Sequence, residues 1–302
     1  MSKFSTKSSG LLTGLDFKRP GNKILYWLIF LLMSIITVIC LFPPVWLFAS
    51  SVKNLQELYS MNPTLFPKTW ELQKIIDVWK QLHFITYYLN SLELAAGDIL
   101  FSLVFNSLFG FVLSQLKPKG TNFLMVLLLW TLLLPNTVNI VPVYMNIIKF
   151  PLLHINFSNT FFPMWFMSGA NAFFTLIFKG FFDGIPRSYT EAAMLDGCSP
   201  LKIFLKIFLP LSKPVMFVIT ILTLTTSWSN FFWPYMVLTN QDLYTVMIRI
   251  FTMIPSGNSG NGMAVDWQML AIVYSMIPPI VVFLFLQKYI MQGGLTLGGI
   301  KG

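Results

Sequence analysis

The sequence predicts an all-α protein that crosses a membrane several times. Of its 302 residues, 55% are hydrophobic and only 10% are charged, whereas soluble domains carry about 25% charged residues. The apolar residues gather in long runs, and a helix of about 20 residues crosses the roughly 30 Å hydrocarbon core of a bilayer. We predict six such spans, and the uneven distribution of Lys and Arg between them supports this fold class.

The first predicted span covers residues 24–50 and follows a basic tail at residues 1–23. This apolar run is too long for the core of a signal peptide. Residues 51–83 are mixed and polar and are predicted to form an extracytoplasmic loop that contains a short amphipathic piece. A core of five spans at residues 84–287 and a tail at residues 288–302 complete the predicted chain. The five spans of the core are predicted at about residues 89–116, 123–147, 160–182, 215–233 and 268–285.

Two of these spans carry residues that are unusual inside a bilayer. The second predicted span contains Glu93 and Asp98, and charges at membrane depth usually face a bundle interior or water. Both carboxylates therefore suit either pairing inside the bundle or a functional role. The third predicted span contains Pro135 and Pro142, which should break or kink its helix.

The basic residues orient the predicted spans. With both termini in the cytoplasm, the cytoplasmic segments hold 14 of the 20 Lys and Arg residues and the external segments hold 6. Positively charged loops tend to stay in the cytoplasm. The net charge of +9 is thus explained by membrane topology, and we expect no nucleic-acid partner.

The most polar stretch inside the core surrounds Gly197. Ser188 lies three residues before Glu191, as in a capping box, so we predict a short helix that starts at residues 185–188. Gly197 can end this helix with a positive φ, and Pro200 prevents its continuation. The stretch is predicted to form a helix, a glycine turn and a second helix at the membrane surface. An ordinary amphipathic interfacial loop is the alternative interpretation.

The sequence contains no constellation that is typical of an active site. It has no G-x-x-x-x-G-K-[ST] loop for phosphate binding and no spacing of His, Cys or acidic residues that is typical of metal ligands. We therefore expect no catalysis and no cofactor bound by this chain. Neutral polar and aromatic residues remain as candidates for a path that accepts an uncharged, polyhydroxylated ligand. These candidates are Asn136, Asn139, Asn171, Trp228, Asn230, Trp233 and Tyr235. Interfacial aromatic residues and packing hydrogen bonds would explain the same residues.

A spacing pattern around Gly197 links the chain to a known family. Glu191, Ala192 and Ala193 are followed after three residues by Gly197, and after nine more by Ile207-Phe208-Leu209-Pro210. This order resembles the EAA motif of the membrane subunits of binding-protein-dependent ABC importers. The resemblance implies a type I ABC importer permease fold, with an EAA loop at residues 183–213. It also implies that a coupling helix contacts an ATPase through Glu191, Ala192, Ala193, Asp196, Gly197, Ile207, Leu209 and Pro210.

Two further stretches resemble the carbohydrate branch of this family. Residues 228–234, W-S-N-F-F-W-P, are similar to a region of carbohydrate-uptake permeases, and residues 295–302 are similar to the tail of the maltose-permease G type. The resemblance implies that the tail contacts the ATPase through Gly298, Gly299, Lys301 and Gly302. It also implies a contact loop for a binding protein at Pro255, Ser256, Gly257 and Asn258.

The resemblance also implies partners and a location. A second permease subunit would form a heterodimer with this chain, and two ATPase subunits would hold ATP and Mg²⁺. An extracytoplasmic sugar-binding protein or lipoprotein would deliver a sugar, with an oligosaccharide expected, and membrane lipid would surround the spans. The expected location is a bacterial cytoplasmic membrane. An ion-coupled secondary transporter is the alternative function, and Glu93 and Asp98 are the residues that favour it.

Overall fold

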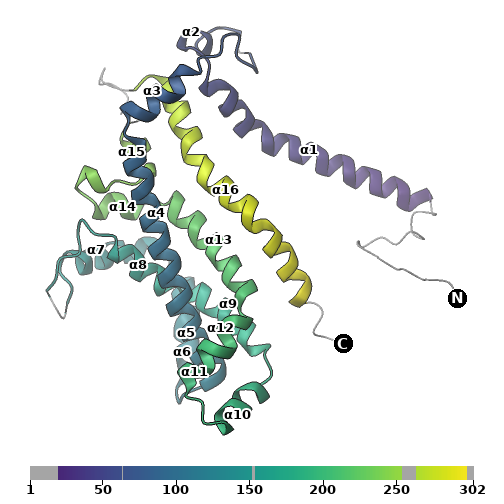
Figure 1. The fold of residues 1–302 in the computed structure, drawn as a ribbon, viewed down its shortest axis with the longest axis vertical. Coiled ribbons are helices and arrows are strands. Elements are labelled where there is room, and N and C mark those ends of the chain that lie inside the picture. Colours follow the sequence, from purple (N-terminus) through teal and green to yellow (C-terminus); the bar gives the residue numbers. More distant parts are fainter. Residues whose placement is uncertain (1–19, 63, 152–153, 254–262, 298–302) are drawn as a thin grey trace. The chain divides into compact units, whose positions relative to one another are not determined.

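The regular elements of the structure are helices (Figure 1). It is a computed structural model that describes residues 20–62, 64–151, 154–253 and 263–297. The chain divides into two compact units, residues 1–72 and 73–302. Each unit is considered by itself below.

The first unit contains one long apolar helix and a short folded loop. Helix α1 (Pro20–Ser51) includes the first predicted span, and α2 (Leu55–Leu58) follows it. The Glu57 carboxylate accepts hydrogen bonds from the Thr64 hydroxyl at 2.6 Å and from the Lys68 amide at 3.0 Å. The bond from Thr64, together with that from Lys68, lowers the pKa of Glu57. These bonds hold the loop after α2 against the helix.

The second unit holds most of the helices. They are α3 (Gln73–Gln81), α4 (Phe84–Phe101), η2 (Ser102–Asn106), α5 (Ser107–Phe111), η3 (Val112–Leu116), α6 (Thr121–Leu133), η4 (Asn136–Asn139), α7 (Ile140–Ile148), α8 (Phe162–Gly169), α9 (Ala172–Asp183), α10 (Ser188–Leu195), α11 (Pro200–Ile203), η5 (Phe204–Phe208), α12 (Leu209–Leu211), α13 (Lys213–Ser229), α14 (Phe232–Val237), η6 (Gln241–Leu243), α15 (Val246–Met253) and α16 (Val265–Leu297).

The second predicted span is one continuous helical segment, Phe84–Leu116. The helical segment begins five residues before the predicted start at residue 89. Its first turn, with the buried Phe84, packs on α3 in an aromatic cluster. Two π-helical turns, η2 and η3, interrupt its α-helical geometry. The segment ends at Lys117, which adopts a left-handed conformation with φ of 43°.

Helix α13 lies between α4 and α16 and contacts both along its length (Figure 1). Helix α5 packs closely on α9. Gly110 permits this approach, because a Cβ atom there would lie 2.8 Å from Phe178 Cβ and 3.0 Å from the Lys179 amide nitrogen. Any larger residue at this position would force the two helices apart.

The third and fourth predicted spans are both broken. Helices α6 and α7 meet at an angle of 97°, and the break lies at Pro135, as predicted, whereas Pro142 lies inside the first turn of α7. The fourth predicted span is divided into α8 and α9 by Ala170 and Asn171. At 12 residues, α9 is about 18 Å long, which is shorter than the hydrocarbon core.

Three helical segments of the described residues are long and apolar enough to cross a membrane. They are Gly21–Ser51, Phe84–Leu116 and Val265–Phe285, and the number rises to five if the bent pairs α6–α7 and α11–α13 each count as one span. The predicted number of six spans and the predicted domain boundaries stay predictions.

The predicted external loop after residue 235 contains more helix than the sequence suggested. Helix α15 packs on α4 and α16, with Val246, Ile248 and Ile250 buried. The Val246 amide donates a hydrogen bond to the buried Ser91 hydroxyl at 2.9 Å. Apolar residues at alternate positions drive this burial, although the polar residues around them favour a loop by composition.

A buried ion pair joins α3 to the beginning of α16. Lys74 Nζ lies 3.2 Å from Asp266 Oδ2, and the two side chains are 6% and 8% exposed. Beside this pair, the Tyr274 hydroxyl donates to the Ile75 carbonyl at 2.5 Å. Buried charges are costly unless they are paired, so the pair fixes α3 on α16.

Replacement of Asp266 by Asn should destabilise the second unit by about 3–5 kcal/mol, because it removes the carboxylate that pairs with the buried Lys74 ammonium. The measurement is the thermal unfolding midpoint of the purified protein in detergent. The control is Asp77→Asn, which changes a half-buried carboxylate of α3 that is outside this ion pair. Equal midpoints for the two variants would contradict this assignment.

Candidate coupling site and polar path

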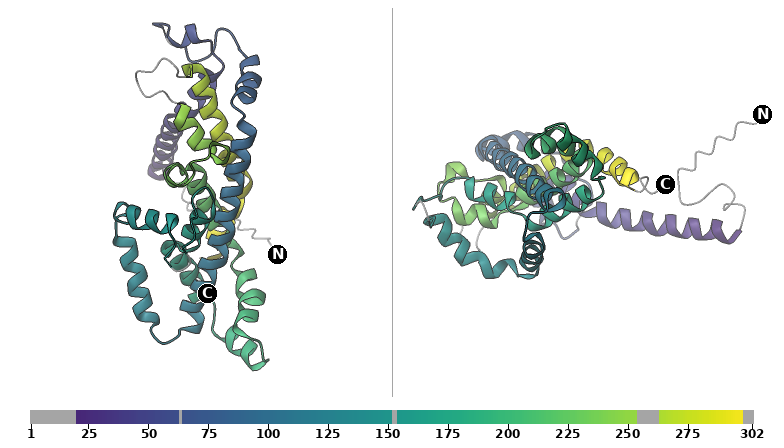
Figure 2. Two further views of the ribbon diagram at one scale, coloured as in Figure 1. Left: turned by 90° about the vertical axis from the view of Figure 1, so that its left-hand side faces the viewer. Right: turned by 90° about the horizontal axis from the view of Figure 1, so that it is seen from below.

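Helix α10 lies at the end of the second unit that is opposite α3 (Figures 1 and 2). It is connected to α9 by residues 184–187 and to α11 by a tight turn. The helix begins at Ser188, inside the predicted range, but Arg187 is its N-cap residue and makes no side-chain capping bond. The predicted capping box is therefore wrong, because Ser188 already belongs to the first turn.

The turn after α10 is the glycine turn that the sequence predicts. Gly197 has a φ of +73°, and its amide donates to the Met194 carbonyl at 3.0 Å. The Cys198 amide donates to the Ala193 carbonyl at 3.0 Å. These two bonds are those of a Schellman motif, in which a left-handed residue closes the end of a helix. A Cβ atom on Gly197 would meet nothing within 4 Å, so the backbone conformation alone demands glycine.

Helix α10 is fixed to the bundle by one face. Ala193 is buried in a phenylalanine cluster that joins α5, α9, η5 and α13. The buried members of this cluster are Phe111, Phe174, Phe178, Phe182, Ala193, Ile203, Phe204, Phe208, Val215 and Ile219. The rest of the α10 surface is exposed. Leu195, opposite the buried face, is 89% exposed, and Tyr189 and Met194, which flank that face, are 54% and 46% exposed. Large apolar side chains on such a surface suit a protein partner.

A polar network joins the same helix to the ends of two others. The Thr190 hydroxyl donates to Gln115 Oε1 at 3.1 Å, and Gln115 Nε2 donates to the Phe182 carbonyl at 2.8 Å. The Ser114 hydroxyl donates to Asp183 Oδ1 at 2.7 Å. Gln115 and Ser114 come from η3, at the end of the segment that starts at Phe84. The network therefore couples α10 to this segment and to α9.

Asp183 is the charged centre of this network. Lys179 Nζ lies 2.6 Å from Asp183 Oδ2. Partial burial raises the pKa of Asp183, but the hydrogen bonds from Lys179 and Ser114 and the charges of Lys179 and Lys117 outweigh it, so the pKa is lowered. Asp183 is thus held as a carboxylate. No motif in the sequence marks Gln115, Thr190 or Asp183, and only Gln115 and Asp183 lie at the ends of apolar runs.

The second half of the predicted coupling motif continues from α11 through η5 to α12. Ile207 and Leu209 pack against the phenylalanine cluster, and Pro210 is exposed. The segment that ends at Leu211 then meets α13 at an angle of 78°. In the first half of the motif Glu191, Ala192 and Asp196 are exposed. The motif therefore divides into packing residues and surface residues.

The predicted path residues make contacts within the chain and do not form one cluster. Trp228 is buried and its indole nitrogen donates to the Ser275 carbonyl at 2.9 Å. Asn171 caps α9 by accepting from the Phe174 amide at 3.0 Å. Asn230 accepts from the Trp233 amide at 3.4 Å. These contacts fit the alternative that the residues make packing hydrogen bonds, and the role of the residues in a path stays a prediction.

The other path residues are more exposed. Tyr235 is 45% exposed and lies against Phe231 and Phe251, with ring centroids 6.0 and 5.9 Å apart. Asn139 is exposed at the start of α7. The side chain of Asn136 lies outside the described part of the chain. The same holds for the predicted binding-protein loop (Pro255–Asn258) and for the predicted ATPase-contacting tail (Gly298–Gly302).

The two carboxylates of the second predicted span have different surroundings. Asp98 is buried and accepts a hydrogen bond from the Ser168 hydroxyl of α8 at 2.8 Å. Glu93 is exposed on α4. Asp98 thus makes a bond inside the bundle, which is the first of the two interpretations that the sequence left open. Among the described residues no three His, Cys, Asp or Glu side chains are grouped so that they could hold a metal ion.

Residues 100–293 match the family described as "Binding-protein-dependent transport system inner membrane component". The chain belongs to this family. It is a multi-pass membrane protein, and as a permease it is a non-enzymatic subunit of an importer whose ATPase is a separate subunit. The family itself carries no cofactor.

Curated relatives of this permease cover nearly its whole length. The arabinooligosaccharides transport system permease protein AraQ of Halalkalibacterium halodurans is 31% identical over 289 residues, which are 94% of this chain and 100% of the relative. AraQ of Bacillus subtilis is 30% identical over 277 residues, 90% of this chain and 94% of the relative. The sn-glycerol-3-phosphate transport system permease protein UgpE of Escherichia coli K12 is 28% identical over 263 residues, 84% of this chain and 90% of the relative.

Solved structures show the same fold. A bacterial ABC transporter involved in the import of the acidic polysaccharide alginate matches with a TM-score of 0.78 at 22% identity, over 90% of this chain and 98% of that chain. A bacterial alginate ABC transporter in complex with an alginate pentasaccharide-bound periplasmic protein matches with a TM-score of 0.60 at 16% identity, over 90% and 94% of the two chains. The predicted fold class, an α-helical ABC importer permease, is confirmed.

Replacement of Gly197 by Val should uncouple ATP hydrolysis from uptake while the permease stays in the membrane. A left-handed conformation costs a residue with a Cβ about 1–2 kcal/mol, which corresponds to about a tenfold loss of the closed turn. The measurement is uptake per ATP hydrolysed in reconstituted vesicles. Gly180→Val is the matched control, because a Cβ at Gly180 also meets nothing within 4 Å but its φ is not positive. Normal coupling in Gly197→Val would contradict this role for the turn.

Replacement of Thr190 by Val should weaken the attachment of α10 by about 1 kcal/mol, the contribution of one hydrogen bond. We expect lower uptake per ATP at an unchanged level of protein in the membrane. Thr226→Val is the control, because the Thr226 hydroxyl donates only to carbonyls of its own helix, Leu222 at 2.9 Å and Thr223 at 3.0 Å. The role of the Gln115 contact is refuted if both variants lose the same amount of uptake.

Proposed function

We propose that this permease forms half of the translocation path of an ATP-driven importer of oligosaccharides, and that α10 couples it to the ATPase. The observation that supports the coupling role is the exposure of three large apolar side chains, Tyr189, Met194 and Leu195, on a helix at one end of the bundle that the Gly197 turn closes. Helix α10 presents Leu195 outward, whereas Ala193 is buried in the phenylalanine cluster. One face is thus available to a partner while the other stays attached.

The proposed coupling follows from this attachment. ATP-driven closure of two ATPase subunits, which hold ATP and Mg²⁺, would move α10 as a rigid element. Thr190 and Gln115 link α10 to the end of the segment Phe84–Leu116, and the phenylalanine cluster links it to α9 and α13. Movement of α10 would therefore rotate these helices and change the side from which the path is open.

The proposed substrate class rests on relatives and on the character of the chain. Two of the relatives are permeases for arabinooligosaccharides, and the predicted path residues are neutral amides and aromatic rings. Such side chains suit stacking and hydrogen bonding with an uncharged sugar. An oligosaccharide is the substrate class that we propose, with much of the selectivity in the binding protein and in a second, different permease subunit.

The proposed arrangement places the permease in a bacterial cytoplasmic membrane with both termini in the cytoplasm. The unequal distribution of Lys and Arg supports this orientation. An extracytoplasmic sugar-binding protein would then contact the loop at Pro255–Asn258, and the tail at Gly298–Gly302 would reach the ATPase. The ion-coupled alternative receives little support, because Asp98 is bonded to Ser168 within the bundle.

Replacement of Leu195 by Glu tests the proposal. Burial of a carboxylate in the docking surface should reduce co-purification of the ATPase with the tagged permease at least about tenfold. Met61→Glu is the control, because Met61 is also fully exposed but lies in the first unit. Unchanged recovery of the ATPase would refute the coupling role. The substrate class is tested separately by uptake of an arabino-oligosaccharide series into vesicles that contain the whole wild-type complex.

A further inference from the structure

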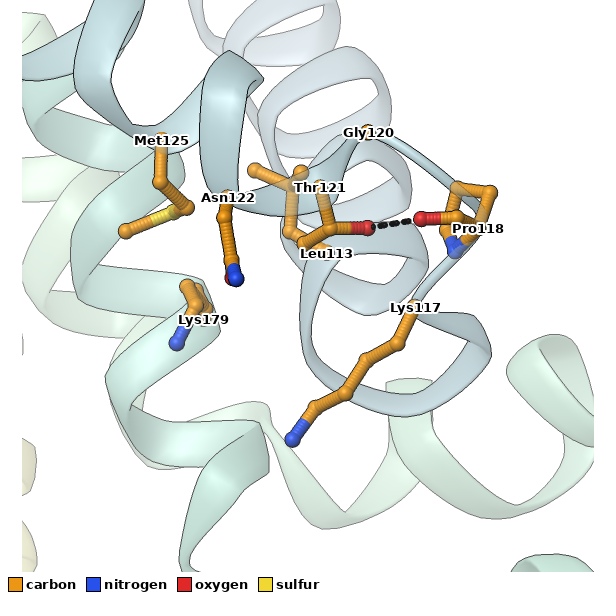
Figure 3. Close-up of a pocket in the computed structure, with 8 residues that line it drawn as sticks. All are labelled: Leu113, Lys117, Pro118, Gly120, Thr121, Asn122, Met125 and Lys179. Atoms are coloured by element: carbon orange, nitrogen blue, oxygen red, sulfur yellow. Dashed lines mark hydrogen bonds between the residues drawn. The ribbon is translucent and has the colours of Figure 1, made fainter.

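A recess of about 520 Å³ lies where the segment Phe84–Leu116 turns into α6 (Figure 3). It is outside the coupling surface and outside the predicted path. Residues from η3, the following turn, α6 and α9 line it. The lining residues are Leu113, Lys117, Pro118, Gly120, Thr121, Asn122, Met125 and Lys179.

The recess is basic on one side and apolar on the other. Lys117 enters it from the turn and Lys179 from α9, while the half-buried Met125 supplies an apolar wall (Figure 3). The Asn122 amide group lies on the first turn of α6. Within the described residues, the structure gives no hydrogen bond to the side chains of Lys117 or Asn122. Both groups can therefore donate to a bound oxygen anion.

The acidic residue beside the recess does not cancel its positive charge. Asp183 Oδ2 binds Lys179 and Oδ1 accepts from Ser114. One ammonium hydrogen of Lys179 is used in that contact, so the others stay available. Lys117 and the neighbouring Lys119 lie on the same turn as the recess. Lys117 and Lys179 thus exceed this carboxylate by one positive charge, and Lys119 adds a second beside the recess.

The position of the recess relative to the bilayer defines the kind of anion. The recess lies where the apolar segment ends at Leu116 and where the apolar helix α6 begins at Thr121. We therefore expect both helices to leave the hydrocarbon at this level, which would place the two ammonium groups at the depth of lipid head groups. Basic pockets between membrane helices at this depth suit phospholipid head groups.

We propose that this recess is a binding site for the phosphate group of an anionic phospholipid, with Lys117 and Lys179 as its charged ligands. The Asn122 amide donates a further hydrogen bond, and Met125 contacts the glycerol and the upper acyl chain. The site depends on the membrane location of the permease and not on its substrate. Its failure would therefore leave the proposed transport function intact.

Native mass spectrometry of the purified permease tests the site, with phosphatidylglycerol and phosphatidylcholine as probes. Wild-type protein should retain phosphatidylglycerol in preference to phosphatidylcholine, and Lys117→Gln should weaken this binding about fivefold, the contribution of one lysine near a membrane surface. Lys117→Arg should keep it. The matched control is Lys119→Gln, which removes the same charge from the same turn but does not line the recess.

Two results would overturn the proposal. Equal retention by Lys117→Gln and wild type would show that Lys117 is no ligand, and equal losses in Lys117→Gln and Lys119→Gln would show only general surface charge. Inorganic phosphate at millimolar concentration distinguishes a lipid site from a phosphate site. Retention in its presence supports a lipid, whereas displacement would overturn the lipid assignment.

A second measurement needs no variant. A photoreactive phosphatidylglycerol, incorporated into nanodiscs with the wild-type permease, should label the peptide that contains Met125 more than other lipid-facing peptides. Phosphatidylglycerol without the photoreactive group should compete for this labelling, and phosphatidylcholine should not. Uniform labelling of all membrane helices would overturn the proposal.

Discussion

The packing of four phenylalanine rings holds the loop at residues 183–213 to the membrane helices of this permease. Phe208 lies between Phe111 and Phe182, with ring centroids 4.9 and 5.5 Å apart, and Phe204 contacts Phe111 at 5.4 Å. These rings come from three separate helical segments, and aromatic pairs at such distances add to the burial of apolar area. Ala193 of α10 enters the same cluster. A loop that is polar by composition is therefore fixed by an apolar core.

This core explains why α10 can be both exposed and rigid. A helix of eight residues is unstable in water by itself. Here one buried alanine, one buried threonine and the closed turn at Gly197 hold it, so Tyr189, Met194 and Leu195 can stay exposed. Because Ala193 of α10 belongs to the phenylalanine cluster, a partner that displaces these side chains would also displace the cluster. The cluster in turn belongs to α5, α9 and α13, and force at the surface reaches the bundle without a flexible joint.

Local sequence signals predicted the parts of this structure that depend on local chemistry. The long apolar runs gave the membrane helices, the left-handed turn followed from Gly197, and Pro135 marked the break before α7. The links between distant segments could not be predicted, because the sequence does not state which helix ends meet. Thr190 and Gln115 lie 75 positions apart, and Trp228 turned inward because Tyr88 and Tyr274 surround it. The short α8 and α9 were missed because both are as apolar as a complete span.

The ion pair between Lys74 and Asp266 has a consequence for biosynthesis. The two residues are 192 positions apart, so α3 leaves the ribosome long before its partner exists. Until α16 is inserted, the Lys74 ammonium lacks the Asp266 carboxylate, and the packing of α3 on the bundle stays incomplete. Helix α16 therefore completes the attachment of α3, which is synthesised much earlier. A chain without an inserted α16 would expose α3, with Lys74 and Lys80, on its surface. A quality-control protease could recognise such an exposed helix.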